Sequence, residues 1–133
     1  EENPELDYVV CEEGERAAVH IVNNLPEEKI VRMPIIKDLD DLPKPARHLL
    51  DYSHYKYIYP GVGIVPMDVI ESSRGCPFLC TFCFNRATKP RYRSPTHVVD
   101  EIEESYNTFG TKLFMFFDVF DFFYRITFLI FII

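Results

Sequence analysis

The chain has 133 residues, 47% of them hydrophobic and 26% charged, which is the composition of an ordinary globular protein with one domain or parts of two. Its formal net charge of −7 argues against a dedicated nucleic-acid-binding surface. Three of the four cysteines fall within eight residues, and such crowding favours metal ligation over disulfide bonds. We therefore expect a reducing, cytoplasmic setting and no nucleic-acid partner.

The first 25 residues predict one strand, one turn and one helix. Leu6–Val10 is typical of a short strand, and the acidic run after it is typical of a turn. Apolar residues then recur at helical spacing, at positions 17, 18, 21, 22 and 25, until Pro26 ends the helix.

Prolines at positions 26, 34, 43, 45, 60 and 66 mark the next stretch as a connecting segment with short elements. We expect a strand over residues 29–33. We also expect one or two helical turns over residues 45–51, with Ala46, Leu49 and Leu50 facing inward. Four tyrosines, at positions 52, 55, 57 and 59, should pack this linker onto a neighbouring surface.

The second half of the chain predicts a strand, a loop, a helix and another strand. Residues 67–72 are typical of a strand that runs into the cysteines. Ser94 and Pro95 are typical of a helix start, and Gly110 of its C-terminal cap. Residues 112–119 are apolar enough for a parallel strand buried on both faces, which would complete a βαβ unit. The helix should bury a stripe made of Val98, Val99, Ile102 and Tyr106, with Glu101, Glu103 and Glu104 mostly off it.

The tail from Leu113 to Ile133 is rich in Phe and Ile and has about the length of a membrane span, ~20 residues. Asp118, Asp121 and Arg125 would offset most of the free energy gained by inserting its apolar side chains. We therefore expect no membrane span, but a buried strand followed by a tail that lacks packing partners.

The cysteine loop runs from Cys76 through Cys80 to Cys83, with three and then two residues between the cysteines. Thiolates at this spacing can hold three corners of a [4Fe–4S] cluster, whose complete protein ligation takes four cysteines. Cys11 lies far upstream, so one iron would stay open, as in a catalytic centre. Two alternatives remain, a structural zinc site and a ferredoxin-like electron carrier. Candidates for a fourth zinc ligand are Cys11, His20, His48, His54 and His97.

The sequence around this loop is basic. No acid lies between Arg74 and Val99, whereas five bases do: Arg74, Arg86, Lys89, Arg91 and Arg93. A cluster on three thiolates is anionic, so these bases would offset its charge and raise its reduction potential. Arg74 and Arg86 flank the loop and could pair with a carboxylate ligand, although each base could equally be a solvated surface charge.

The segment Glu71-Ser-Ser-Arg-Gly-Cys-Pro-Phe-Leu-Cys-Thr-Phe-Cys-Phe84 resembles the radical S-adenosylmethionine superfamily, and within it the branch that carries an N-terminal cobalamin-binding domain. The resemblance implies that Cys76, Cys80 and Cys83 are the cluster ligands. S-adenosylmethionine would then chelate the fourth iron and be cleaved to a 5′-deoxyadenosyl radical. Phe82 matches an aromatic residue near the adenine, and Asp118 matches the end of the second barrel strand, although Val119 stands where this branch often has a second acid.

The resemblance covers residues 3–120 and implies an α/β fold. Residues 1–28 would be the C-terminal end of a cobalamin-binding Rossmann-like domain, 29–66 a linker, and 67–133 the N-terminal part of a (β/α)6 radical S-adenosylmethionine barrel with its first βαβ unit. Because the chain lacks an initial Met and supplies only two barrel strands, we expect a truncated piece, inactive alone and prone to aggregation.

The resemblance implies an enzyme with a [4Fe–4S] cluster and S-adenosylmethionine, and with cobalamin in the full-length protein. We expect a small-molecule substrate and an external electron donor, with cobalamin-dependent methyl transfer as the first reaction to consider. The alternative is a structural or interaction module that binds zinc. The substrate cannot be derived from these residues.

Overall fold

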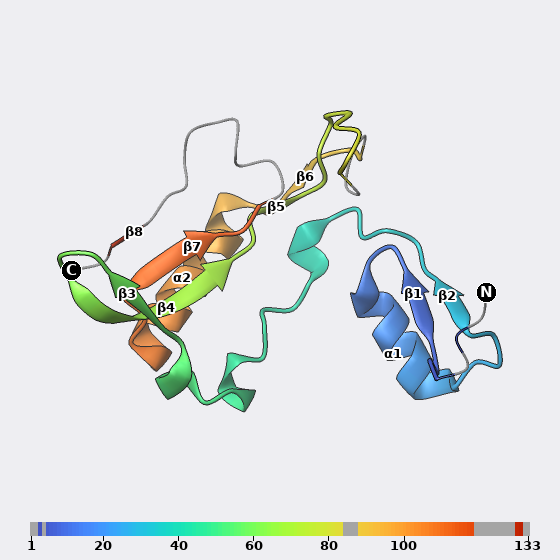
Figure 1. Cartoon of the computed structure of the whole chain (residues 1–133), viewed down its shortest axis with the longest axis horizontal. Helices are drawn as coiled ribbons and strands as arrows, with labels where there is room; N and C mark the ends of the chain where they lie inside the picture. The colour runs from blue at the N-terminus through green and yellow to red at the C-terminus, as the bar shows by residue number, and fades with distance from the viewer. Residues whose placement is uncertain (1–2, 4, 84–87, 119–129, 132–133) are drawn as a thin grey trace. The chain divides into compact units, whose positions relative to one another are not determined.

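The computed structural model describes residues 3, 5–83, 88–118 and 130–131, and shows a mixed α/β chain (Figure 1). The chain divides into two compact units, Glu1–Lys37 and Asp38–Ile133. The mixed α/β class predicted from the sequence is confirmed. The predicted division at residues 28 and 66 stays a prediction.

The first unit is one small βαβ arrangement. Strand β1 (Val9–Cys11) pairs in parallel with β2 (Ile30–Arg32), with Val9 opposite Ile30, and helix α1 (Gly14–Asn24) connects them. Its buried apolar side chains are Ala17, Val31 and Ile36. Helix α1 ends at Leu25, which adopts φ 43° and donates its N–H to the carbonyl of Ile21. The predicted strand, helix and second strand are thus confirmed.

The second unit is built on a four-stranded sheet in the order β3-β4-β7-β8. Its strands are β3 (Lys56–Tyr59), β4 (Gly63–Ile70), β7 (Leu113–Phe116) and β8 (Ile130–Phe131). Strands β4 and β7 are parallel, with Met67 opposite Leu113, whereas β3 and β8 are antiparallel to their neighbours. The expected parallel strand after the helix is therefore confirmed, while most of the apolar tail lies outside the described residues.

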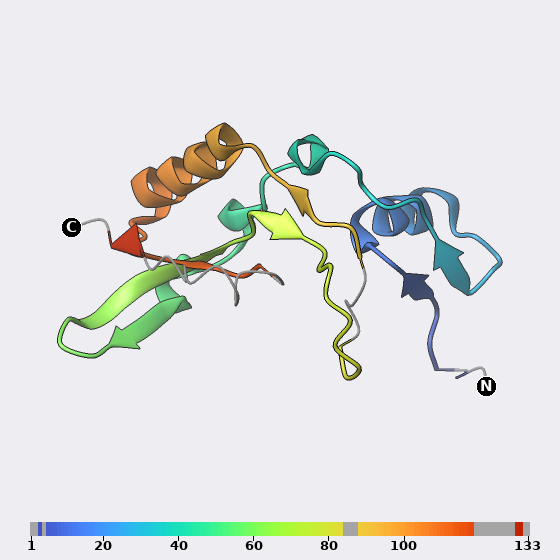
Figure 2. The same ribbon diagram turned by 90° about the horizontal axis from the view of Figure 1, so that it is seen from above.

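Helix α2 (Pro95–Phe109) connects the two parallel strands and lies along one face of them (Figure 2). Ser94 caps it as expected, because its hydroxyl accepts a hydrogen bond from the N–H of His97. At the other end Gly110 takes φ 68°, the left-handed conformation that glycine tolerates best. The core between helix and sheet consists of Ile70, Val98, Ile102 and Phe114.

The sequence misplaced the polar and apolar faces at two points. On α2, Val99 is 50% exposed whereas Glu101 is 1% exposed, the reverse of the prediction. In the linker, Ala46, Leu49 and Leu50 all lie exposed, and Arg47 is buried instead. A buried salt bridge joins Arg47 to Glu101, so two charged side chains lie in the interior at positions that the pattern predicted to be exposed.

The linker that precedes the sheet contains three short 3-10 helices, Leu39–Asp41, Arg47–Leu49 and Tyr52–His54. Of its tyrosines, Tyr52 packs as predicted: its ring stacks on Phe109 of α2, with centroids 4.5 Å apart, and on Tyr55 at 5.3 Å. Strand β3, which carries Tyr57, was not predicted at all, because the prolines around it indicated a connecting segment.

Tyr52 should titrate late. Burial and the neighbouring charge of Asp68, which accepts a hydrogen bond from the phenol, raise its pKa to about 12. A raised pKa means that the folded state holds this proton more tightly than the unfolded state. The resulting stability is complete below pH ~10 and is lost as the pH rises towards 12. In an ultraviolet titration, Tyr52→Phe should remove a step near pH 12; a step lost near pH 10 would contradict the assignment.

No helix in the described part of the chain has the length and apolar character needed to cross a membrane.

Candidate iron–sulfur site

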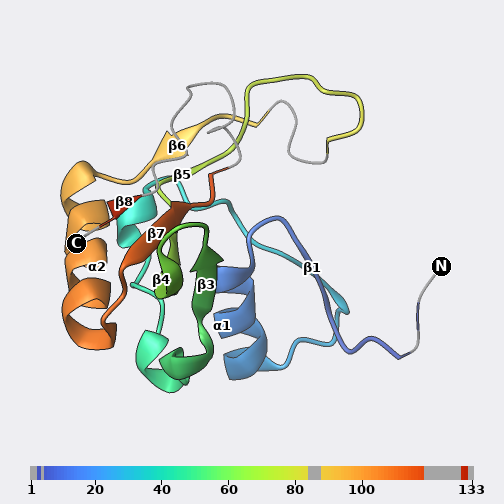
Figure 3. The same cartoon turned by 60° about the vertical axis from the view of Figure 1, so that its left-hand side comes forward.

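The cysteine loop rises from a short stem at the carboxyl end of β4. Strand β5 (Ser73–Arg74) pairs antiparallel with β6 (Arg91–Tyr92), so that Ser73 lies opposite Tyr92. The stem follows β4 after two residues and precedes α2 by two. Figure 3 shows the loop extending from this stem, away from the four-stranded sheet. The loop therefore occupies the βα connection, the usual place for function in parallel α/β folds.

The first cysteine is fixed by contacts just above the stem. The N–H of Cys76 donates to the hydroxyl of Thr88 at 2.8 Å, and the N–H of Thr88 donates to the carbonyl of Cys76 at 2.9 Å. Gly75 permits this closure, because it has φ 94° and a Cβ there would lie 2.5 Å from the carbonyl oxygen of Lys89. The structure thus pins one end of the loop at Cys76.

The other two cysteines are more accessible. Cys76 is 8% exposed, Cys83 is half-buried and Cys80 is exposed, and none of the three is in a disulfide. The N–H of Cys83 donates to the carbonyl of Cys80 at 3.1 Å, which closes a turn. Phe82, predicted to lie near an adenine, sits in this turn and is 91% exposed.

The donor set fits a cluster in its chemistry. Three thiols without disulfide partners stand on one short loop, and thiolates are the usual ligands of a [4Fe–4S] core. No group of three or more His, Cys, Asp or Glu side chains among residues 3, 5–83, 88–118 and 130–131 is arranged to hold a metal ion. The ligand assignment therefore rests on thiol chemistry and on the pinned base of the loop.

Asp118 lies just beyond β7 and ties the two parallel strands together at the stem. Its Oδ1 accepts hydrogen bonds from the N–H groups of Ser72 at 2.7 Å and Ser73 at 2.8 Å, and its Oδ2 accepts one from the Ser72 hydroxyl. The sequence placed Asp118 near S-adenosylmethionine, and that role stays a prediction. The contacts themselves make Asp118 an anchor of the stem.

Two substitutions of Asp118 should show how much its hydrogen bonds to the stem contribute to stability. Asp118→Ala leaves two backbone N–H groups without their acceptor, and we expect the free energy of unfolding to fall by ~2 kcal/mol. Asp118→Asn keeps an Oδ1 acceptor for both amides and should lose markedly less. Urea denaturation of both variants measures the difference; equal losses would show that the amide contacts contribute nothing.

The basic surroundings of the loop are more balanced than the sequence indicated. Arg74 pairs through Nε with Glu71 at 2.8 Å, and Arg93 pairs with Glu101 at 2.5 Å. Both partners lie outside the acid-free stretch in sequence but beside it in space. Arg86 lies outside the described residues. Charge counting along the chain therefore overstated the positive charge around the stem.

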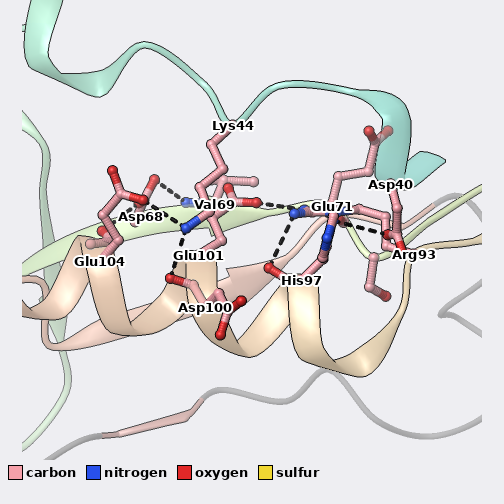
Figure 4. A network of polar contacts seen from close by, with 12 residues as sticks. Asp40, Lys44, Asp68, Val69, Glu71, Arg93, His97, Asp100, Glu101 and Glu104 are labelled. Carbon is pink, nitrogen blue, oxygen red and sulfur yellow. Dashed lines mark hydrogen bonds and ion pairs between the residues drawn. The ribbon is translucent and has the colours of Figure 1, made fainter.

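A buried polar network joins the linker to β4 and α2, and it was not predicted. Arg47 pairs through Nη2 with Glu101 and through Nε with Asp68, both at 2.6 Å. Asp68 also accepts a hydrogen bond from the hydroxyl of Ser105 at 2.6 Å, and that hydroxyl lies 2.8 Å from the Thr111 hydroxyl. Burial alone would lower the pKa of Arg47, but the hydrogen bond to Glu101 and the two negative charges outweigh it and raise that pKa. Figure 4 shows these carboxylates between linker and helix.

One signal could have revealed part of this network. Positions 98, 101, 102 and 105 share one face of α2, at the spacing of a buried helical stripe. Glu101 and Ser105 lie on that face, and buried charged residues are almost always paired. The partner Arg47 is separated by 54 residues, so no local pattern identifies it.

Comparison with curated proteins gives four significant matches, three of them to enzymes with one name. An anaerobic magnesium-protoporphyrin IX monomethyl ester cyclase from Synechocystis sp. is 31% identical over 84% of this chain and 25% of its own length. The cyclase of that name from Cereibacter sphaeroides is 31% identical over 86% of this chain and 22% of its own length. An uncharacterised methyltransferase from Pyrococcus horikoshii is 28% identical over 88% of this chain and 29% of its own length.

The chain thus spans about a quarter of the length of the curated relatives that it matches. No family model matches it, and no solved structure does. Its relatives are named as enzymes, a cyclase and a methyltransferase.

Proposed function

Because this chain belongs to the radical S-adenosylmethionine superfamily, we propose that its cysteine loop holds a [4Fe–4S] cluster through Cys76, Cys80 and Cys83. The observation that carries the proposal is the loop itself: three thiols without disulfides, set on a pinned stem at the carboxyl end of β4. Such a cluster would supply the electron that cleaves S-adenosylmethionine to a 5′-deoxyadenosyl radical.

The residues of this chain would position and shield that chemistry. Cys76, buried and fixed by Thr88, would set the inner corner of the cluster, while Cys80 and Cys83 approach from the exposed turn. Phe82, on that turn, would cover the adenine of the bound cofactor. Arg74 now pairs with Glu71. To bind the carboxylate of S-adenosylmethionine, its guanidinium would have to pair with both carboxylates or give up Glu71.

The finer architecture is also part of the proposal. Strands β4 and β7 with the α2 crossover would be the first βαβ unit of a (β/α)6 barrel, and the parallel pairing of the two strands supports this. Residues 1–28 would be the end of a cobalamin-binding Rossmann-like domain, and the parallel β1–β2 pair with its connecting helix α1 supports this.

The reaction of the whole protein is proposed from its relatives. Their names point to two outcomes, ring closure on a porphyrin ester and methyl transfer. We propose cobalamin-dependent methyl transfer to a small molecule, with an external electron donor, in a cytoplasmic setting. Ring closure on a tetrapyrrole is the second candidate, favoured by the three cyclases among the matches.

Anaerobic reconstitution tests the site. The full chain, fused to a soluble carrier protein, is incubated with iron and sulfide, reduced with dithionite, and examined by electron paramagnetic resonance. We expect four irons per chain and a reduced [4Fe–4S] signal that changes when S-adenosylmethionine is added. Stoichiometric zinc with no bound iron would instead establish the structural zinc module. A cluster signal indifferent to S-adenosylmethionine would indicate an electron carrier.

A further inference from the structure

The carboxylate of Glu101 touches both the linker and the stem of the cysteine loop. Its Oε1 lies 2.6 Å from Nη2 of Arg47, which belongs to the linker. Its Oε2 lies 2.5 Å from Nη1 of Arg93, which directly follows strand β6 of the stem. The Glu101 side chain is 2% exposed, so its charge is shielded from water and depends on these two cations.

Arg93 in turn holds the junction between β4 and the stem. Its backbone N–H donates to the carbonyl of Ser72 at 2.9 Å, and its Nη1 donates to the carbonyl of Glu71 at 2.9 Å. These two carbonyls lie between the end of β4 and the start of β5. The orientation of the Arg93 guanidinium therefore helps to fix where the stem, and with it Cys76, leaves the sheet.

Arg47 is attached equally firmly on its own side. Besides Glu101 it pairs with Asp68 at 2.6 Å and donates to the carbonyl of Val69 at 3.3 Å, both on β4. A single guanidinium thus joins the linker to the strand and to the helix. Its planar fork of donors suits such bridging, whereas a lysine ammonium is a compact point charge.

We propose that Arg47, Glu101 and Arg93 form a largely buried ion triad through which the linker positions the cysteine loop. Arg47 is then a positioning residue that acts through Glu101 and Arg93, although it touches neither the loop nor its stem. One consequence of the inference, that the triad stabilises the bound cluster, rests on the proposed function. The coupling between linker and stem can be tested in the protein without a cluster.

Hydrogen exchange in the full chain tests the coupling directly. Arg47→Met removes the bridge, leaves Glu101 with Arg93 alone and leaves Asp68 without its guanidinium partner. We call the amides of Thr88 and Arg93, which lie on either side of strand β6, the stem amides. We expect them to exchange on the order of tenfold faster, while the Gly110 amide, bonded to Tyr106 at the far end of α2, keeps its rate. Unchanged stem amides, or an equal acceleration at all three, would overturn the proposal.

The chain offers a matched control. Lys44 belongs to the same linker and also binds α2, through Glu104 at 2.7 Å and the carbonyl of Asp100 at 3.1 Å, but at the surface. Lys44→Met should leave both stem amides unchanged; an effect as large as that of Arg47→Met would mean that any linker contact suffices. If Arg47→Met does not fold, Arg47→Lys is measured under the same criteria, since its ammonium lacks the planar fork that bridges both carboxylates.

Cluster retention separates this inference from the proposed function. In reconstituted protein, we expect a chelator to remove iron several-fold faster from Arg47→Met than from Lys44→Met. If both variants lost iron at the same rate, the role of the triad would be overturned, but the proposal that the loop holds a cluster would stand. A wild-type chain that takes up no cluster refutes the proposed function, and the exchange rates then decide alone whether linker and stem are coupled.

Discussion

Cys80→Ala should abolish cluster binding. Cys80 is the exposed middle cysteine of the loop, and at the proposed site removing its thiolate would leave two protein ligands for a cluster that needs at least three. We expect bound iron to fall from four per chain to a background level, and the reduced signal in electron paramagnetic resonance to disappear. The fold should persist, because Cys80 lies outside the helices and strands.

Cys11→Ala is the matched control. Cys11 ends strand β1 in the first unit, and its thiol is also outside any disulfide. A cluster with three protein ligands and one open iron does not need it. Full iron content and an unchanged response to S-adenosylmethionine are therefore expected. Loss of the cluster in this variant would mean that a fourth thiolate closes the site, which would exclude the proposed chemistry.

The sequence predicted best the features that depend on neighbouring residues. The caps of α2 are one example, because Ser94 and Gly110 act within a single turn of the helix. The parallel strand β7 is another, since an apolar run that follows such a helix is typically buried as the next parallel strand of the sheet. The three cysteines could be named as candidate ligands because their spacing is itself local.

The features that depend on distant partners were missed. The stem pairs Ser73 with Tyr92 and Arg74 with Arg91 in strands of two residues, which are too short to leave a pattern. Strand β3 forms only because β4 lies beside it, and the prolines around it suggested a loop. The buried face of α2 was misjudged because an arginine 54 positions earlier makes a glutamate the right residue for an interior position.

Glu101→Gln should strongly destabilise the interface between the linker and helix α2. It keeps the size of the side chain but removes the negative charge between two guanidinium groups, of which Arg47 is 7% exposed. Removing one partner of a buried ion pair typically costs ~3–5 kcal/mol, and the loss should lie at the lower end of this range because Arg47 keeps Asp68 as a second partner. We expect a loss of that size in the free energy of unfolding, measured by urea denaturation followed by circular dichroism.

Glu104→Gln is the matched comparison, three residues further along the same helix. Its carboxylate also pairs with a linker base, Lys44 at 2.7 Å, and the hydrogen bond from that lysine lowers the pKa of Glu104. Because both groups are solvated, water and salt already screen their attraction, and we expect no measurable loss of stability. Equal losses of stability in the two variants would show that burial does not strengthen the ion pairs of Glu101. A loss in Glu101→Gln alone would show that the interior charge holds the linker against the helix.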